Sequence, residues 1–346
     1  MKNIKTGLIV AILSIASIAN ATVLTVSNLG GSQYANIYDA YNAAVNTDTL
    51  MVEGSATTYA QNSFLWSKQL VVIGSGINSN KQNFVPTYFG NFSNNAGCFL
   101  FGTGGEGSIF YGITFISTIN PGNIVSIQFE DCLFNARVGV DNTNITNWSF
   151  KNCVFAPHDA DNFYFNGCTI TNLSISNCIF NGWLHNYNYY IASNFIIDHC
   201  LFLTLTAAFP TDAGSGCFMN TTIKNSIFVN LTSLGNCFGT GMNFTNCISY
   251  NSVGNGVTQY NNLAFANYVI ASNWSTSSDF HPTAPSAIFG GADDGTDIGV
   301  HGGSAHFSER GEPLNVNIIR VLNVTNTAAP NGTLNVNITA GKPNDQ

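Results

Sequence analysis

The side chains with the clearest potential for chemistry fall on consecutive segments of a repeated pattern. Arg137 and His158 each follow a repeat-closing phenylalanine by three residues, and Asp159 and Asp161 adjoin His158. His185 has a similar place one repeat later. Stacked strands lie about 4.8 Å apart, so these groups are expected to meet on one face. Because proton transfer needs a base and a charged partner in contact, the candidate catalytic residues are Arg137, His158 and Asp161.

Aromatic side chains crowd the next segment of the chain. Aromatic rings stack on the apolar faces of sugars, and exposed clusters of them mark binding sites. The expected substrate-binding residues are Asp159, Trp183, His185, Tyr187, Tyr189 and Tyr190. Lys151 and Asp141 are expected as outliers of the same patch. The alternative is a polar loop whose rings pack against the side of the fold.

These segments belong to a repeat with a period of 21 to 26 residues. Each copy runs apolar, variable, polar, small, apolar, and most copies end in phenylalanine. The small position is filled by Cys132, Cys153, Cys178, Cys200, Ser226 and Cys247. Such a period indicates a solenoid; propeller blades need about 40 residues, and no helical segment recurs. The sequence predicts an all-β, single-stranded, right-handed parallel β-helix.

The preceding polar position of each copy is expected to form a corner between two strands. It is filled by Asp131, Asn152, Asn177, His199, Asn225 and Asn246. Short Asn and Asp side chains tolerate the left-handed backbone conformation, which suits a tight corner. Stacking the coils would give a polar ladder, with columns of cysteine and phenylalanine pointing inward.

Nine cysteines in an exported chain first suggest disulfides, but an odd number cannot pair completely. A second set at Cys168, Cys217 and Cys237 precedes the first set by nine or ten residues. Cysteines at one point of successive coils are expected to be free and buried. No Cys or His pair has zinc-site spacing, so no metal site is predicted.

The two ends of the chain differ from the repeats. Residues 1–21 combine Lys2 and Lys5 with an apolar run ending in small residues, which predicts a signal peptide. Residues 22–306 are expected to form the β-helix, with a capping helix in 34–45 and first-coil strands at 49–52 and 69–73. Residues 307–346 are expected to form a terminal strand tail with a β-hairpin joined at 330–332.

Composition restricts the partners. The net charge of −8 and only three arginines give no basic patch, so nucleic acid is excluded as a ligand. Charged residues are only 8% of the chain but hydrophobic residues are 45%, which is typical of a folded protein. After the signal, no run is long and apolar enough to span a membrane, and the mature protein is expected to be secreted or held at the cell surface. The oligomeric state is not predicted.

The Asn-Cys-x-Phe coils, the opening Tyr34-Ala-Asn-Ile and the closing Gly295-Thr-Asp-Ile-Gly-Val-His-Gly-Gly303 resemble the pectate-lyase-like β-helix proteins that bacteria export. That superfamily includes lyases, glycoside hydrolases and adhesins, so the resemblance implies a fold more than a reaction. The hydrolase arrangement of paired aspartates on successive coils is missing. Asp293-Asp294 is interpreted as a loop or a turn compatible with Ca²⁺; no other cofactor is expected.

The expected function is therefore an exported β-helix that binds an extracellular polysaccharide or serves as a structural or adhesive module. The alternative is a polysaccharide lyase or glycoside hydrolase that uses the patch around Arg137, His158 and Asp161.

Overall fold

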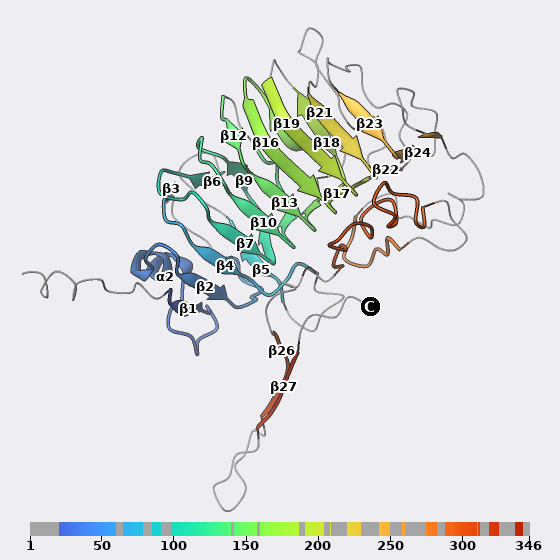
Figure 1. Cartoon of the computed structure of the whole chain (residues 1–346). Helices are drawn as coiled ribbons and strands as arrows, with labels where there is room; N and C mark the ends of the chain where they lie inside the picture. Colours follow the sequence, from blue (N-terminus) through green and yellow to red (C-terminus); the bar gives the residue numbers. More distant parts are fainter. Residues whose placement is uncertain are drawn as a thin grey trace, which may run out of the picture.

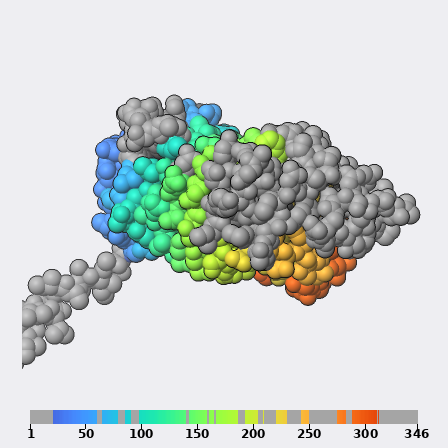
Figure 2. Space-filling model, turned by 90° about the horizontal axis from the view of Figure 1, so that it is seen from above, coloured from blue at the N-terminus to red at the C-terminus, as the bar shows by residue number. Residues whose placement is uncertain are grey.

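The protein is a parallel β-solenoid in which the chain winds through stacked coils (Figure 1). The computed structural model describes residues 21–59, 65–78, 85–90, 98–139, 142–157, 160–186, 191–203, 208, 220–229, 242–249, 258–259, 274–281, 288–309, 311, 318–324 and 336–341. The predicted parallel β-helix is confirmed, because every strand pair within the coils is parallel and successive coils pair in sequence order. The coils follow one another along the long axis, from blue to yellow in Figure 2.

Three sheets form the sides of the coils. The first contains β1 (Val23–Val26), β2 (Thr49–Val52), β4 (Val71–Ile73), β7 (Ile109–Tyr111), β10 (Gln128–Glu130), β12 (Ile145–Thr146), β13 (Ser149–Lys151), β16 (Thr169–Ser176), β19 (Ile191–Asp198), β21 (Thr221–Lys224) and β23 (Asn243–Thr245). The second contains β5 (Thr87–Phe89), β8 (Ile113–Phe115), β11 (Leu133–Phe134), β14 (Val154–Phe155), β17 (Ile179–Phe180), β20 (Leu201–Phe202), β22 (Ile227–Phe228), β24 (Ile248–Ser249) and β25 (Thr258–Gln259).

The third side is built from shorter pieces. It contains β3 (Leu65–Trp66), β6 (Cys98–Phe101) and β9 (Thr118–Asn120), and then β15 (Asp161–Phe165) and β18 (Trp183–Asn186). Val138 connects the two groups, because it forms single bridges to Ile119 on one side and Phe163 on the other. We call this continuous surface the third sheet.

The corner between the first and second sheets has the predicted conformation. The six polar corner residues all have φ between 49° and 55°. The backbone amides of the first five donate to the next coil, as in the bond from N of Asn152 to O of Ser176. Left-handed backbone turns the chain within one residue, so each coil can pass from one sheet to the next without a loop.

A second bend also uses asparagines in the left-handed conformation; it lies just before β13 and β21 and within β16 and β19. Asn147, Asn172, Asn194 and Asn220 have φ between 49° and 59°. Their amides form an exposed ladder, with Nδ2 of Asn172 donating to Asn147 at 2.8 Å and Nδ2 of Asn194 donating to Asn172 at 3.0 Å. These asparagines lie outside the repeated six-residue segment around each cysteine, so this ladder was not predicted from the sequence.

The interior is an aromatic stack, as the repeat predicts. Each coil places one phenylalanine of the second sheet above its predecessor, with ring centroids 4.7–5.3 Å apart and planes within 16° of parallel. The stacked rings belong to Phe115, Phe134, Phe155, Phe180, Phe202 and Phe228. Offset aromatic stacking adds to the free energy that burial of each ring contributes.

The cysteines of the repeat are buried and free. Cys132, Cys153, Cys178, Cys200 and Cys247 are at most 1% exposed, and none of the described cysteines forms a disulfide. Burial raises the pKa of Cys247 to about 12, so this thiol stays protonated and inert. Cys168 is also buried, whereas Cys217 and Cys237 lie outside the described residues.

The N-terminal end is covered as predicted. Helix α2 (Ile37–Ala43) begins at the N-cap Asn36, whose side chain accepts a hydrogen bond from the amide of Asp39. Its face of Ile37, Ala40 and Tyr41 is buried against the first coils. The helix thus shields apolar side chains that a further coil would otherwise cover. The predicted signal peptide lies almost entirely outside the described residues.

A C-terminal segment packs lengthwise over the outer face of the second sheet. We call its described residues, 274–281, 288–309 and 311, the strap; it is orange in Figure 1. Its apolar side chains form a second core with outward-facing residues of the second sheet. The strap contributes Phe280, Ile288, Ala292, Ile298, Val300 and Phe307; the sheet contributes Leu133, Val154, Ile179, Leu201, Ile227 and Ile248. The predicted domain boundary between residues 306 and 307 falls inside this packed segment.

Hydrogen bonds from the polar corner residues between the first and second sheets, which we call the corner ladder, hold the strap in place. Nδ2 of Asn177 donates to O of Val300 at 3.0 Å and to O of Gly302 at 2.7 Å. Asn225 exchanges two hydrogen bonds with Asp293, at 2.7 and 3.1 Å. The Asp293-Asp294 turn therefore includes a residue that binds the solenoid through its side chain and backbone.

Beyond the strap, β26 (Ile318–Val324) and β27 (Val336–Gly341) pair antiparallel. This confirms the predicted C-terminal β-hairpin, although its expected joining turn lies outside the described residues. Figure 1 shows the two strands apart from the coils.

Candidate functional site

The third sheet brings together four of the nine predicted site residues, and the other five lie outside the described residues. Its inward positions are filled by apolar side chains, among them Val138, Phe163 and Leu184, which are fully buried. Because residues alternate along a strand, their neighbours Arg137, Tyr164, Trp183 and His185 point outward. The sheet therefore holds these polar and aromatic groups on a rigid, aromatic-packed base.

Asp161 is the centre of a three-coil network. Its Oδ1 lies 2.8 Å from Nδ1 of His185, and its Oδ2 lies 3.7 Å from a terminal nitrogen of Arg137. The Asp161 side chain is 20% exposed and that of Arg137 is 40% exposed. The carboxylate thus compensates Arg137 and orients the imidazole of His185, while solvent still reaches the guanidinium.

Aromatic rings flank this network. The guanidinium of Arg137 lies 4.2 Å from the centroid of the Tyr164 ring, a cation–π contact. Trp183 packs edge-on against His185, with centroids 6.2 Å apart and planes at 87°. Gly139 makes this arrangement possible, because a Cβ there would collide with the carbonyl of Tyr164, and its φ is 102°. The rings and the charged groups consequently form one continuous surface.

Two asparagines fix the local chain path beneath the network. The fully buried Asn162 donates from Nδ2 to O of Pro157 and accepts from the amide of Gly182 at 2.7 Å. Asn181 donates to O of Ala156. These bonds fix the first residues of β15 and β18, so Asp161 and Trp183 have defined positions.

The strand register of the third sheet differs from the one obtained by counting residues from the phenylalanine of each coil. Counting three residues past phenylalanine places His158 level with Arg137, but Val138 pairs with Phe163, so residues 161–162 occupy that level. The coil from Cys153 to Cys178 is four residues longer than its predecessor, and the additional residues precede Asp161. His158 and Asp159 themselves lie outside the described residues, as do Tyr187, Tyr189 and Tyr190.

Lys151 was an expected outlier of the patch, and this expectation is wrong. It lies on β13 of the first sheet, where Nζ is 2.9 Å from Oε1 of Glu130. Strand β13 precedes the corner, so its outward side chains leave through a different side of the coil. Asp141 lies outside the described residues.

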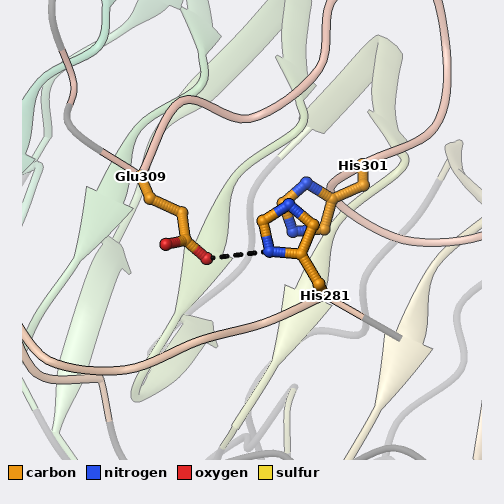
Figure 3. A group of neighbouring side chains, drawn as sticks. All are labelled: His281, His301 and Glu309. Carbon is orange, nitrogen blue, oxygen red and sulfur yellow. Dashed lines mark ion pairs between the residues drawn. The ribbon is translucent and has the colours of Figure 1, made fainter. Parts of the chain in front are cut away.

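A second cluster lies in the strap, where the sequence analysis placed no site. His281, His301 and Glu309 each offer a ligand atom within 4.8 Å of the others (Figure 3). The two imidazole rings are stacked, with centroids 3.9 Å apart. The three residues are 20 and 8 positions apart in irregular chain, so no short motif could have signalled the cluster.

The charges of the two histidines are set in opposite directions. The hydrogen bond to Glu309, with a second to Asp279, raises the pKa of His281 to about 9 despite partial burial. Burial lowers the pKa of His301 to about 4, and the neighbouring charge of His281 adds to this effect. At neutral pH His281 is therefore a cation and His301 a neutral imidazole.

No protein-family model matches the chain, and no curated protein is detectably similar to it. The structure itself defines the class, a parallel β-solenoid with a lateral C-terminal strap. Among the described residues, none forms a helix with the length and hydropathy needed to cross a membrane.

Proposed function

We propose that this chain is an exported or cell-surface β-helix protein of the pectate-lyase-like type that binds an extracellular glycan on the third sheet. The observation that carries the proposal is the convergence of Arg137, Asp161, Trp183 and His185 from three successive coils. Hydrogen-bonding groups beside an aromatic ring are what a sugar needs, since it presents hydroxyls at its edge and C–H groups on its faces.

A neutral glycan fits this surface better than an acidic one. Asp161 already compensates Arg137, and the whole chain has a net charge of −8. A polyanion would meet general repulsion with little local compensation. The Asp161 carboxylate and the imidazole of His185 can instead accept and donate hydrogen bonds to hydroxyls.

The test is a panel of neutral and acidic polysaccharides measured by affinity electrophoresis and calorimetry. Trp183→Ala and Asp161→Asn are expected to weaken binding of a neutral glycan by at least about tenfold, the loss of one stacking contact or charged hydrogen bond. Lys151→Ala is the matched control, because it removes an ion-paired cation on another side of the coil. Equal binding by all variants would contradict the assigned face.

The second candidate is a lyase, favoured by the position of Arg137 beside an ordered histidine and carboxylate. Arg137 would offset the charge of a uronate carboxyl, and His185, oriented by Asp161, would take the proton from the neighbouring carbon. The glycosidic C–O bond at the next carbon would break to leave a carbon–carbon double bond, and the departing oxygen would take a proton from water. Unsaturated product absorbing in the ultraviolet, lost in Arg137→Ala, would establish this reaction. Binding without such product would reject it.

A further inference from the structure

The strap contains a cluster whose contacts are only partly explained by ion pairing. Nδ1 of His281 lies 2.8 Å from Oδ1 of Asp279 and 3.3 Å from Oε1 of Glu309. These two carboxylates account for His281. They do not account for His301, whose ring is stacked on that of His281 at 3.9 Å.

The unexplained atom is Nε2 of His301. It is buried and has no hydrogen-bond partner among the described residues. Buried polar atoms are nearly always satisfied by protein, water or an ion, and an ion held together with His281 and Glu309 would satisfy this nitrogen. The ring of His301 lies against that of His281, and ligand atoms of both histidines and of Glu309 lie within 4.8 Å of one another (Figure 3).

We propose that His281, His301 and Glu309 bind a divalent transition-metal ion, with Zn²⁺ the best fit. Two imidazoles and one carboxylate are a ligand set that zinc accepts, whereas Ca²⁺ and Mg²⁺ require mostly oxygen ligands. Zinc–ligand bonds of about 2.0–2.2 Å in a tetrahedron separate neighbouring ligand atoms by about 3.4 Å. The distance of 3.3 Å between Nδ1 of His281 and Oε1 of Glu309 is close to this value, and the third ligand atom lies within 4.8 Å. Because an imidazole binds a metal in its own plane and only when deprotonated, binding would rotate the two stacked rings apart and release the proton of His281.

The strap backbone places the three ligands. The amide of Phe280 donates to the Glu309 side chain at 3.3 Å, and the amide of Phe307 donates to O of Val300 at 2.9 Å. These bonds draw the segments that carry His281, His301 and Glu309 together above the second core. Phe280, Val300 and Phe307 belong to that core, so a bound ion would cross-link the strap where it covers the second sheet.

Three protein ligands leave a fourth position for water or another small ligand. The site is also partly open, since the side chain of His281 is 56% exposed. We therefore expect exchangeable binding that chelators reverse, rather than an ion permanently enclosed during folding.

The experiment uses the full chain, dialysed against a chelator and titrated with ZnCl₂ by calorimetry. One Zn²⁺ is expected to bind per chain and to raise the unfolding temperature. His281→Ala and Glu309→Gln should each weaken binding by at least tenfold and reduce the thermal shift. His281 is exposed, so its variant is expected to fold; His301→Ala is the second variant, with far-ultraviolet circular dichroism to confirm folding.

His185→Ala is the matched control, because it removes a histidine of the third sheet and leaves the strap intact. Anomalous scattering at the zinc edge should place the ion between the three side chains. No Zn²⁺ binding by the wild-type chain, unchanged binding by His281→Ala, or tighter binding of Ca²⁺ than of Zn²⁺ would each overturn the proposal. Glycan binding is measured separately, so either proposal can fail alone.

Discussion

The outer faces of the second and third sheets are built in opposite ways on the same coils. The second sheet turns Leu133, Val154, Ile179 and their equivalents outward, and the strap buries them. On the third sheet Arg137 points outward. Its charged and aromatic neighbours Asp161 and Tyr164 are also partly exposed to solvent. A sheet with an apolar outer face must be buried by another segment, whereas a sheet with a polar and aromatic outer face can stay exposed and bind a ligand.

Asparagines in the left-handed conformation also have two different roles on the two sides of the coil. On the strap side, corner side chains such as Asn177 and Asn225 satisfy carbonyls and a carboxylate of the strap. On the far side, Asn147, Asn172 and Asn194 bond to one another and stay exposed. The same residue type in the same backbone conformation therefore serves attachment in one ladder and coil stacking in the other.

The largest effect should come from placing a charge under the strap. Leu201→Asp loses a fully buried side chain and buries a carboxylate without a partner, and should cost at least about 3 kcal/mol of unfolding free energy. Thr118→Asp makes the same addition on the half-exposed third sheet and should cost under about 1 kcal/mol. Urea unfolding measures both. Equal costs would mean that the strap does not seal the second sheet.

Next in size is a steric test of the strap itself. A Cβ at Gly302 would collide with the carbonyl of Asp297 and with the ring of His199, so Gly302→Ala should destabilise by about 2–3 kcal/mol. Gly295→Ala is the control, because a Cβ there meets nothing within 4 Å and only its φ of 80° opposes the change. Its expected cost is about 1 kcal/mol. Thermal unfolding that ranks the two variants in the other order would contradict the close packing of Gly302.

The coils could be predicted from the sequence because every coil repeats the same order of residue types. The polar corner residue, the buried cysteine and the stacked phenylalanine recur in a fixed order. The repeat therefore predicted the corner at Asn152, the burial of Cys153 and the ring stacking of Phe155. The asparagine ladder at Asn172 was missed because it lies outside that phrase. Helix α2 was found from its apolar face, which needs only local periodicity.

The sites could be predicted only in part. Arg137, Asp161, Trp183 and His185 were identified as one patch, and the structure brings these four together. Counting could not reveal where a longer coil takes up its additional residues, and the structure pairs Val138 with Phe163, whereas His158 lies outside the described residues. Its catalytic role remains a prediction.

The strap cluster was beyond prediction for a different physical reason. The strap has no repeat, and its path is set by docking onto the corner ladder and the second sheet. Without that path, nothing in the sequence brings His281 to His301 and Glu309.

A smaller effect should distinguish the two asparagine ladders. Asn177→Gly and Asn172→Gly both keep a residue that accepts positive φ, so their backbone costs nearly cancel in the comparison. Asn177→Gly also removes two buried hydrogen bonds to the strap and should be less stable by a further 1–2 kcal/mol, roughly. Limited proteolysis should cut its strap sooner. Similar stability and cleavage in both variants would show that the corner ladder does not fasten the strap.

The smallest effect concerns the charged cluster beside the strap. Burial raises the pKa of Asp198, but hydrogen bonds and charges from His199, Asn225 and Lys224 outweigh it, so the pKa lies below its usual value. The folded state therefore favours the carboxylate, and its contribution is complete above the unfolded pKa of about 3.9. That contribution is lost as the pH falls through the lower folded value.

Asp198→Asn removes this acid-sensitive contribution. The variant should be slightly less stable than the wild type at pH 7, and the difference should shrink steadily below about pH 4, because protonation already removes the wild-type interaction there. Urea unfolding at pH 7, 5, 4 and 3 measures the difference. A gap that stays constant or widens on acidification would show that Asp198 supports the strap side of the coil through shape and not through charge.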